Sequence, residues 1–220
     1  MALTFLQQQQ YASDLLDDAN NGYFTLPILK MRLNLAQREL QKRLISANQQ
    51  YYMKCVKANT ITNQDTYTLP SDFMELIWFG YVLSGSGQTA DYRQITNMTP
   101  GQRNLADGIT GDPDFYFFMG NSFVLKPTPN RAVEMHLEYA YNVVDMVNDS
   151  DLPDAPEPFH EYIPILATRD CLIKDGRDLA PIGSKMAQFE ELLKQIAVQR
   201  RADSPRMITA TQSWEGRGGY

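Results

Sequence analysis

The sequence predicts an α+β fold in which a helical bundle carries a small antiparallel β domain. Apolar residues recur with a helical period near both ends of the chain, whereas the middle consists of short β-favouring segments separated by turn signals. We therefore expect a helical bundle from residues 1–58 and 157–199, and an antiparallel β domain with an acidic connector at 59–156. Residues 200–220 have no period and are expected to form an extended C-terminal arm.

Two helices are predicted before residue 58. The first ends at the sequence NNG of residues 20–22, and the second begins near Thr25, a suitable N-cap, with Pro27 in its first turn. We expect the second helix to continue to about Lys57, a length of more than roughly 40 Å at ~1.5 Å per residue. Its apolar stripe has spacings of three and four and consists of Leu29, Leu33, Ala36, Leu40, Leu44, Ala47 and Tyr51.

The middle of the chain predicts strands and hairpins. A short hairpin is expected around residues 63–65, and a second one at Gly120-Asn121, a two-residue turn of the Gly-Asn type. Residues 84–88 are expected to form a flexible loop and Thr99–Ala106 a helical turn. The expected strands are Thr60–Thr62, Thr66–Leu69, Glu75–Leu83, Asp91–Thr96, Phe115–Met119, Ser122–Lys126 and Ala132–Tyr141, the last with clear alternation.

Helical character returns after an acidic, proline-rich connector at residues 145–158, which we expect to be solvated. Helices are predicted at Phe159–Lys174 and Ala187–Val198, although Pro164 lies in the first turns of the former. We expect these two helices and the long second helix to form one bundle, with the β domain inserted between its parts.

The net charge of −6 is unevenly distributed along the chain. Residues 1–58 hold seven basic and four acidic residues, whereas residues 59–156 hold four and thirteen, a net charge of −9. Because phosphate affinity comes from Lys and Arg, the acidic middle argues against tight DNA binding there. The sequence shows neither a targeting signal nor an apolar run of membrane-spanning length, so we expect a protein made in a cytoplasm, without membrane contact.

The cysteines and histidines predict no cofactor and no metal site. Cys55 and Cys171 lie far apart in apolar surroundings and are expected to be small buried side chains rather than a disulfide. His160-Glu161 begins like a zinc-protease helix, but Pro164 occupies the position of the second ligand. Calcium at Asp149, Asp151 and Asp154 and phosphate at Ser84–Gly87 are disfavoured because the required spacings are absent.

Several segments together resemble a known family. They are TYTLPSDFMEL after the long helix, LKPTPN after an aromatic hairpin, a strand ending in LEYAY, and DSDLPDAPEPFHEYIPILATRDCL before the last helix. Over roughly residues 25–200 the chain resembles the head-to-tail adaptor (connector) proteins of tailed phages, and is similar to the first tail ring of short-tailed phages. These segments are structural signatures rather than catalytic ones.

The resemblance implies a structural virion protein in the neck between capsid and tail, assembled in the host cytoplasm. Its expected partners are other copies of itself in a ring, commonly of twelve, the portal above, and a tail or nozzle protein below. Viral DNA is expected to pass through the channel without specific binding. The resemblance also implies that the helices and the C-terminal arm clamp the portal.

Interface residues are predicted instead of catalytic ones. Arginines alternate with apolar residues in the arm, which favours attachment to a partner over nucleic-acid stacking or a disordered end. The expected portal-binding residues are Arg200, Arg201, Arg206, Met207, Ile208, Trp214, Arg217 and Tyr220. In the strand of Phe115–Met119 about half of the aromatic side chains should be buried, and Tyr116 and Phe118, together with Tyr51, are expected at an interface with another subunit or the tail.

Three alternative functions are left open by the sequence. A tail-tube or tail-completion ring protein is nearest to the adaptor prediction. A tail-associated cell-wall hydrolase would use paired carboxylates, for which Asp112 and Asp114 are the candidates. A DNA-binding protein would show affinity that falls steeply with salt.

Overall fold

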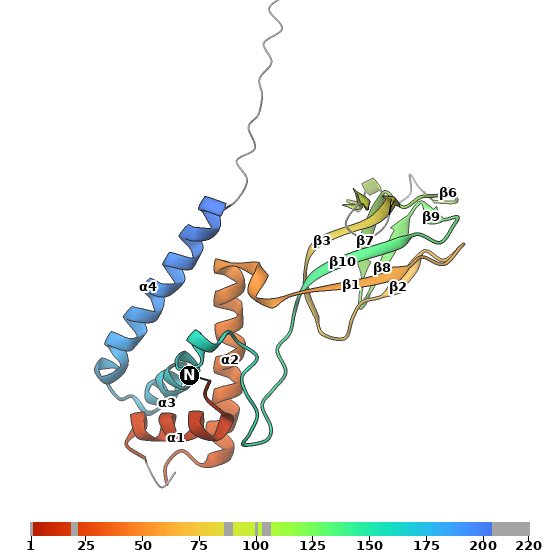
Figure 1. Ribbon diagram of the computed structural model, residues 1–220. Helices are drawn as coiled ribbons and strands as arrows, with labels where there is room; N and C mark the ends of the chain where they lie inside the picture. Colours follow the sequence, from red (N-terminus) through yellow and green to blue (C-terminus); the bar gives the residue numbers. More distant parts are fainter. Residues whose placement is uncertain (1, 19–21, 86–89, 100, 103–106, 204–220) are drawn as a thin grey trace, which may run out of the picture.

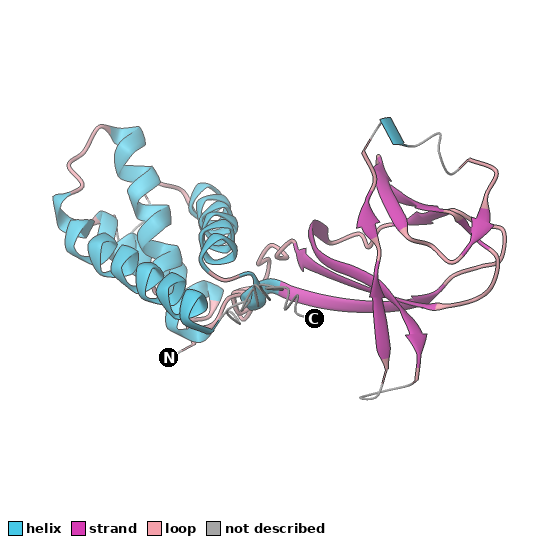
Figure 2. Ribbon diagram, turned by 90° about the horizontal axis from the view of Figure 1, so that it is seen from above, coloured by secondary structure: helices cyan, strands magenta, loops and turns pink. Residues whose placement is uncertain are grey.

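The computed structural model describes the whole chain except residues 1, 19–21, 86–89, 100, 103–106 and 204–220 (Figure 1). Four α-helices in the described residues form a helical unit, and the strands form a separate β unit beside it (Figure 2). The helices come from both ends of the chain and the strands from its middle. The predicted α+β class, a bundle with an inserted antiparallel β region, is confirmed.

The second helix begins at the predicted N-cap position, Thr25, whose side chain makes no capping hydrogen bond, and the first helix has a cap that the sequence analysis did not predict. Helix α1, Phe5–Leu16, begins with a capping box in which Thr4 and Gln7 exchange side-chain to backbone hydrogen bonds. Helix α2, Leu26–Ala47, begins after Thr25 with Pro27 in its first turn. The predicted apolar stripe of α2 is buried from Leu29 to Ala47, where it forms the centre of the helical core.

The predicted extension of α2 to Lys57 is wrong. The helix ends at Ala47, and Asn48 is extended, with φ −154° and ψ 111°, while its side chain accepts a hydrogen bond from the Gln50 N–H. A 3-10 turn, η1 (Gln49–Tyr52), then leads into strand β1, Met53–Asn59, which pairs along its whole length with a strand far away in sequence. In residues 53–59, backbone hydrogen bonds to that strand take the place of the hydrogen bonds that a continued helix would form.

The last two helices complete the bundle. A 3-10 turn, η4 (Glu157–Phe159), precedes helix α3, Tyr162–Asp175, which ends at Gly176 in the left-handed conformation at φ 69°. Helix α4, Ala180–Asp203, begins earlier than predicted. Helix α3 contacts α1, α2 and α4, as expected for a bundle. The core between them is mainly aliphatic and includes Phe5, Leu16, Leu29, Leu33, Leu40, Leu44, Ile163, Leu166, Leu172, Ile182 and Phe189.

The β unit consists of two four-stranded sheets and one short ladder. The first sheet has the order β1-β10-β3-β4 and is antiparallel throughout. The second has the order β2-β8-β7-β5, and β6 pairs with β9. Besides β1, the strands are β2 (Thr66–Thr68), β3 (Phe73–Ser84), β4 (Asp91–Gln94), β5 (Thr96–Asn97), β6 (Thr110–Gly111), β7 (Phe115–Met119), β8 (Ser122–Lys126), β9 (Thr128–Pro129) and β10 (Glu134–Tyr141).

The core of the β unit is rich in aromatic rings. Phe79 packs edge-on against Tyr116 and Phe123, with ring centroids 5.4 and 5.1 Å apart. Such edge-to-face pairs stabilise by about 0.5–1.5 kcal/mol beyond their buried area. The remaining members of the cluster are Leu69, Tyr81, Ile95, Leu125, Val133, Met135, Leu137 and Tyr139.

One of the two predicted hairpins forms. Strands β7 and β8 are joined by Gly120-Asn121, with Gly120 at φ 61°, which confirms the expected turn. The predicted hairpin at residues 60–69 is wrong, because Thr66–Thr68 pairs with β8 and Thr60 instead bonds to residues 131 and 133. The predicted loop at 84–88 and the helical turn at Thr99–Ala106 lie largely outside the described residues.

The two cysteines differ, contrary to the prediction that both are buried. Cys171 is buried in the helical core, whereas Cys55 is exposed on β1, an edge strand all of whose residues are exposed. Both are free thiols. Burial against the bundle raises the pKa of the Cys171 thiol, and partial burial beside Glu138 raises that of Cys55.

Candidate assembly surfaces

Residues 142–156, called the strap from here on, leave β10 and follow the outer side of α2. Asn34 forms a reciprocal pair with the backbone of Met146, with distances of 3.0 and 2.9 Å. Gln37 donates to the Val144 carbonyl at 2.8 Å and accepts from the Asp154 N–H at 3.2 Å. The strap is therefore bonded to α2 by side-chain amides that copy the donor and acceptor pattern of a neighbouring strand.

A third amide continues this row toward the β unit. Gln41 donates to the Tyr141 carbonyl and accepts from the Val143 N–H at 3.4 Å. Positions 34, 37 and 41 lie on one face of the helix because their spacing is three and four. Gln37 and Gln41 are 0% and 2% exposed, so these hydrogen bonds are shielded from water and are costly to break.

The acidic residues of the strap are also bound to the protein. Asp149 accepts from Lys30 at 2.9 Å, and this hydrogen bond holds the pKa of its carboxyl below the usual range. Asp145 accepts from Arg38 at 2.6 and 2.8 Å, and the Asp151 carboxylate accepts from two backbone N–H groups of the strap. The side chains of Asp145 and Asp149 remain 42% and 56% exposed, so the acidic connector is solvated as predicted, but α2 also supplies cationic partners to these two carboxylates.

The start of α1 closes the other side of the strap. Phe5 and Leu6 donate their N–H groups to the carbonyls of Asp151 and Asp149, at 2.8 and 3.0 Å. His160 accepts from the Leu3 N–H at Nδ1, 3.2 Å away, and its Nε2 lies 2.9 Å from the Ala155 carbonyl. These contacts fit a neutral imidazole that donates from Nε2, a structural role rather than that of a metal ligand.

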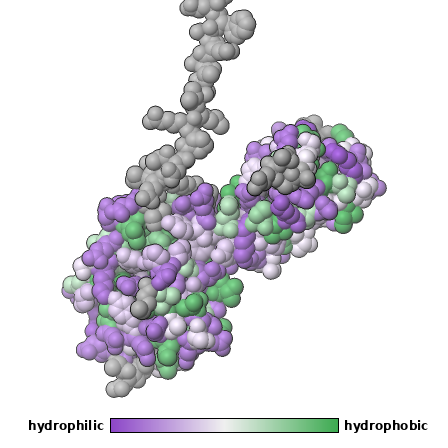
Figure 3. All heavy atoms as spheres, viewed as in Figure 1, coloured by the Kyte–Doolittle hydropathy of each residue, from purple (hydrophilic) through white to green (hydrophobic). Residues whose placement is uncertain are grey.

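The strap presents apolar side chains to solvent. Val144, Val147 and Leu152 are 76%, 71% and 55% exposed, although the backbone that carries them is held against α2. On α2 itself, Met31 and Leu35 are 51% and 41% exposed. We call these five residues the strap surface. Figure 3 shows that apolar residues are spread over the visible face of both units, between hydrophilic ones.

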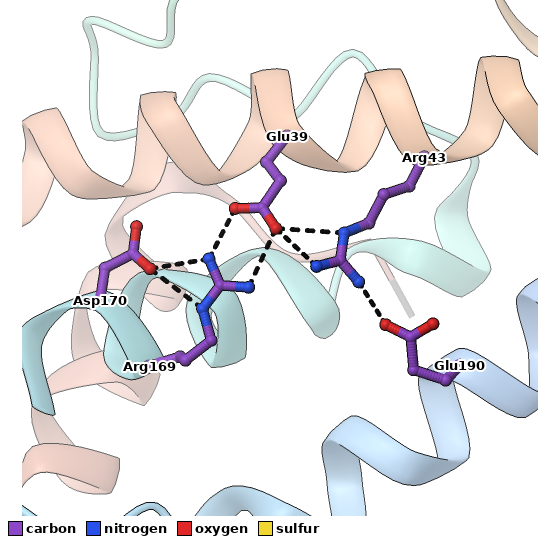
Figure 4. Close-up of polar contacts among 5 residues, drawn as sticks. All are labelled: Glu39, Arg43, Arg169, Asp170 and Glu190. Carbon is purple, nitrogen blue, oxygen red and sulfur yellow. Dashed lines mark hydrogen bonds and ion pairs between the residues drawn. The ribbon is translucent and has the colours of Figure 1, made fainter. Parts of the chain in front are cut away.

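A polar network joins α3 and α4 to α2 (Figure 4). Arg169 of α3 donates to both carboxylate oxygens of Glu39 on α2, at 2.9 and 2.6 Å, and also to Asp170. Arg43 bonds to the same Glu39 and reaches Glu190 on α4. The Arg169 hydrogen bonds are the main cause that lowers the pKa of the Glu39 carboxyl. The network therefore connects three of the four helices through charged side chains.

Helix α2 meets the strap and α4 on opposite sides, as Figure 1 shows. Residues 30, 34, 37, 38 and 41 face the strap, whereas Arg43 and its neighbours face α4. Near the turn between α3 and α4, Ile173 and Leu179 are 58% and 37% exposed. The helical unit therefore has two different lateral surfaces with exposed apolar residues, which a head-to-tail contact between copies requires.

The predicted interface residues of the described chain separate into two kinds. Tyr116 is 8% exposed and packs against Phe79, so it belongs to the β core and offers little contact area to another chain. Phe118 and Tyr51 are each 38% exposed, beside Phe73 and Phe159 respectively. Both remain available for contact with a neighbour.

The predicted portal-binding residues lie at or beyond the end of α4. Arg200 and Arg201 are in the last turns of α4, where only the backbone is described. The other six are outside the described residues; they are Arg206, Met207, Ile208, Trp214, Arg217 and Tyr220.

The carboxylates considered for a hydrolase are bound by arginines. Asp112 accepts from Arg131 at 2.8 Å through both oxygens, and this hydrogen bond lowers the pKa of its carboxyl. Asp114 lies 2.8 Å from Arg93. A general acid needs a raised pKa, so Asp112 is unsuited to that role. In the described part of the chain, no three His, Cys, Asp or Glu side chains are grouped as metal ligands.

No helix among the described residues has the length and apolar composition needed to cross a bilayer. A family model described as SU10 adaptor protein matches residues 3–211 of the chain. No curated protein matches it.

Proposed function

This chain belongs to the family of SU10 adaptor proteins, and on that premise we propose that it is a head-to-tail adaptor ring docked beneath the portal of a tailed phage. The family makes it a phage adaptor, a structural component of the virion. In this proposal, copies of the chain form a ring in the neck of the particle. The ring seals the DNA exit and is the platform for the next tail component.

The strap surface is the observation that carries this proposal. Three side chains more than half exposed, Val144, Val147 and Leu152, are held on a backbone fixed by buried amides. Apolar side chains on an ordered backbone associate without the entropy cost of ordering a loop. We assign this surface to the contact with the next copy, opposite the side that carries Ile173 and Leu179.

The ring would contain about twelve copies, as the resemblance implies, joined head to tail by these two lateral surfaces. Helix α4 would point its end and the arm of residues 200–220 toward the portal. The arm's contacts are assigned to Arg200, Arg201, Arg206, Met207, Ile208, Trp214, Arg217 and Tyr220. Weak contacts of one arm add up to firm attachment when many arms bind together.

The charge of the β unit supports a channel that lets DNA pass. Four of its basic side chains are engaged by carboxylates: Lys54 by Asp72, Arg93 by Asp114, Lys126 by Asp107 and Arg131 by Asp112. Paired cations in an acidic segment offer little to phosphates. We therefore expect the channel to repel DNA weakly and to bind no particular sequence.

Changing the strap surface tests the ring. The double substitution Val144→Asp and Val147→Asp should leave the monomer folded but prevent ring formation, as measured by native mass spectrometry and electron microscopy with portal rings. Ile61→Asp, at a residue 57% exposed in the β unit, is the matched control and should assemble normally. Normal rings from the double variant would refute the assignment of the strap surface.

Removing residues 200–220 tests the arm separately. The shortened chain should still form rings but fail to attach to portal rings, because the lateral surfaces are intact. Attachment equal to that of the full chain would refute portal binding by the arm. Loss of ring formation as well would show that the arm binds neighbouring copies instead.

A further inference from the structure

A recess opens on the face of the first sheet that points away from the aromatic core of the β unit. It has a volume of about 360 Å³ and is lined by Trp78, Tyr92, His136 and Glu138, from β3, β4 and β10. Trp78 and Tyr92 are nearly perpendicular, with ring centroids 6.0 Å apart, and the Tyr92 ring is 4.7 Å from that of His136. Three aromatic rings and one carboxylate thus surround a space of side-chain size.

Gly80 leaves room for the Trp78 ring because it has no Cβ. A Cβ at Gly80 would lie 2.3 Å from the indole Cη2 and 2.7 Å from the Arg93 carbonyl oxygen, so the indole rests directly on the strand backbone. Glycine weakens a strand interior and often marks a place where another group approaches closely. Here it leaves room for the indole over the strand, where its ring meets that of Tyr92 edge-on and forms one wall of the recess.

The carboxylate of the recess, Glu138, differs from the neighbouring Glu134 in whether it has a partner. Glu134 lies 2.6 Å from the buried His136 and 3.7 Å from Lys57, so it orients the imidazole and is already paired. Glu138 is directly opposite Trp78 in the strand register and has no cationic partner among the described residues. The recess therefore combines rigid aromatic faces with one unpaired negative charge.

We propose that this recess binds an arginine side chain presented by a protein partner. A planar guanidinium stacks on the indole of Trp78 or the ring of Tyr92 while it donates to the Glu138 carboxylate, a pairing that stacking and hydrogen-bonding geometry favour together. A purely apolar side chain would bury Glu138 without a partner, which is costly. The volume is near the lower limit of ligand pockets and suits one side chain better than a cofactor.

The site goes beyond the proposed ring because it names the chemistry that the β unit recognises, whichever component of the particle supplies it. It also stands without the ring, since its geometry is complete in one chain. An ammonium group would use only part of it, because lysine cannot stack and donate two parallel hydrogen bonds at once.

Tryptophan fluorescence gives a direct test. The chain has two tryptophans, so Trp214→Phe leaves Trp78 as its only tryptophan, which is excited selectively over the tyrosines at the red edge of the absorption band. This variant, full length, is titrated with N-acetyl-arginine amide and with N-acetyl-citrulline amide, which has the same shape without the charge. Arginine should give a saturable change in the Trp78 emission, and citrulline at least fivefold weaker binding. An equal response to the two probes, or none, overturns the proposal.

A matched pair of charge variants locates the site. Glu138→Gln keeps the shape and should weaken the binding of N-acetyl-arginine amide at least fivefold. Glu75→Gln removes the same charge from an exposed position of β3 outside the recess and should change binding less than twofold. Circular dichroism verifies that both variants are folded. Unchanged binding by Glu138→Gln, or equal loss in the two variants, shows that the recess is not the site.

Discussion

The two units of the molecule are stabilised by different kinds of contact. In the helical unit, an aliphatic core is surrounded by buried amides and forked ion pairs that join helices and strap. In the β unit, aromatic rings fill the space between the sheets, and the register of the strands determines which rings are in contact. The first unit therefore depends on contacts between neighbouring elements, and the second on correct strand pairing.

The largest expected effect is a cavity in the aliphatic core. Leu40 is 0% exposed in the middle of α2, and Leu40→Ala should lower the free energy of unfolding of the helical unit by about 3 kcal/mol. Hydrogen exchange followed by mass spectrometry should show faster exchange in α2 and α3 and unchanged exchange in β7 and β8. Equal loss of protection in both units would mean that they unfold as one.

Leu35→Ala is the control on the same helix. Leu35 is 41% exposed, so the same truncation should cost only about 0.5 kcal/mol. Because Leu35 belongs to the strap surface, the variant should weaken ring formation instead. A cost equal to that of Leu40→Ala would mean that the strap surface is part of the core.

Overpacking the sheet should affect the other unit. In Gly80→Ala the new methyl group collides with the Trp78 ring and the Arg93 carbonyl oxygen. This should destabilise the β unit by about 2 kcal/mol and change the Trp78 emission. Gly183→Ala, in α4 with no atom within 4 Å of the new Cβ, should instead stabilise by about 0.5 kcal/mol. Thermal unfolding of the two variants measures this difference in sign.

Removing one amide should loosen the strap alone. Gln37→Ala leaves the Val144 carbonyl and the Asp154 N–H without their partner and should cost about 1.5 kcal/mol. The amide hydrogen of Asp154 should exchange faster, while those of β10 stay protected. Gln10→Ala, an exposed glutamine on α1, serves as the control and should be neutral. Unchanged exchange at Asp154 would refute the role of the amides.

The helices could be predicted because their signal is local. The stripe of α2 from Leu29 to Ala47 follows a period that the helix itself imposes, and the structure buries it as predicted. The end of α2 could not be predicted, because residues 53–59 become a strand only when β10 lies beside them. The same cause explains the wrong hairpin at Thr60, whose partners are more than sixty residues away.

The candidate site was predicted only in outline. Asn34, Gln37 and Gln41 beside an apolar stripe were a signal that a backbone segment passes there, but polar residues at such positions usually face water. The alternation of β7 predicted that Tyr116 and Phe118 lie on one face of the strand. Only Tyr116 is buried, because Phe118 lies near the hairpin turn at the end of the sheet. Whether a residue of a strand is buried depends on the elements that pack against that part of the strand, and the alternation of one strand does not reveal them.

The smallest expected effect is the part of the pH dependence of the helical unit that Glu39 causes. The Arg169 hydrogen bonds lower the pKa of Glu39 in the folded chain below its ordinary value of 4.5. The stabilisation by this carboxylate is therefore present above about pH 4.5 and disappears as the pH falls through the lowered value, with a magnitude under about 1 kcal/mol because the pair is partly exposed. Glu39→Gln should flatten the pH dependence of α2 and α3 protection, and Arg169→Lys, which keeps the charge but loses the fork, should reduce it. The β unit has carboxyls of its own with lowered pKa values, such as those of Asp72 and Asp112, but the two substitutions do not touch them, so its protection should follow the same curve in all three proteins. A change confined to the β unit would place the acid-sensitive contact there instead.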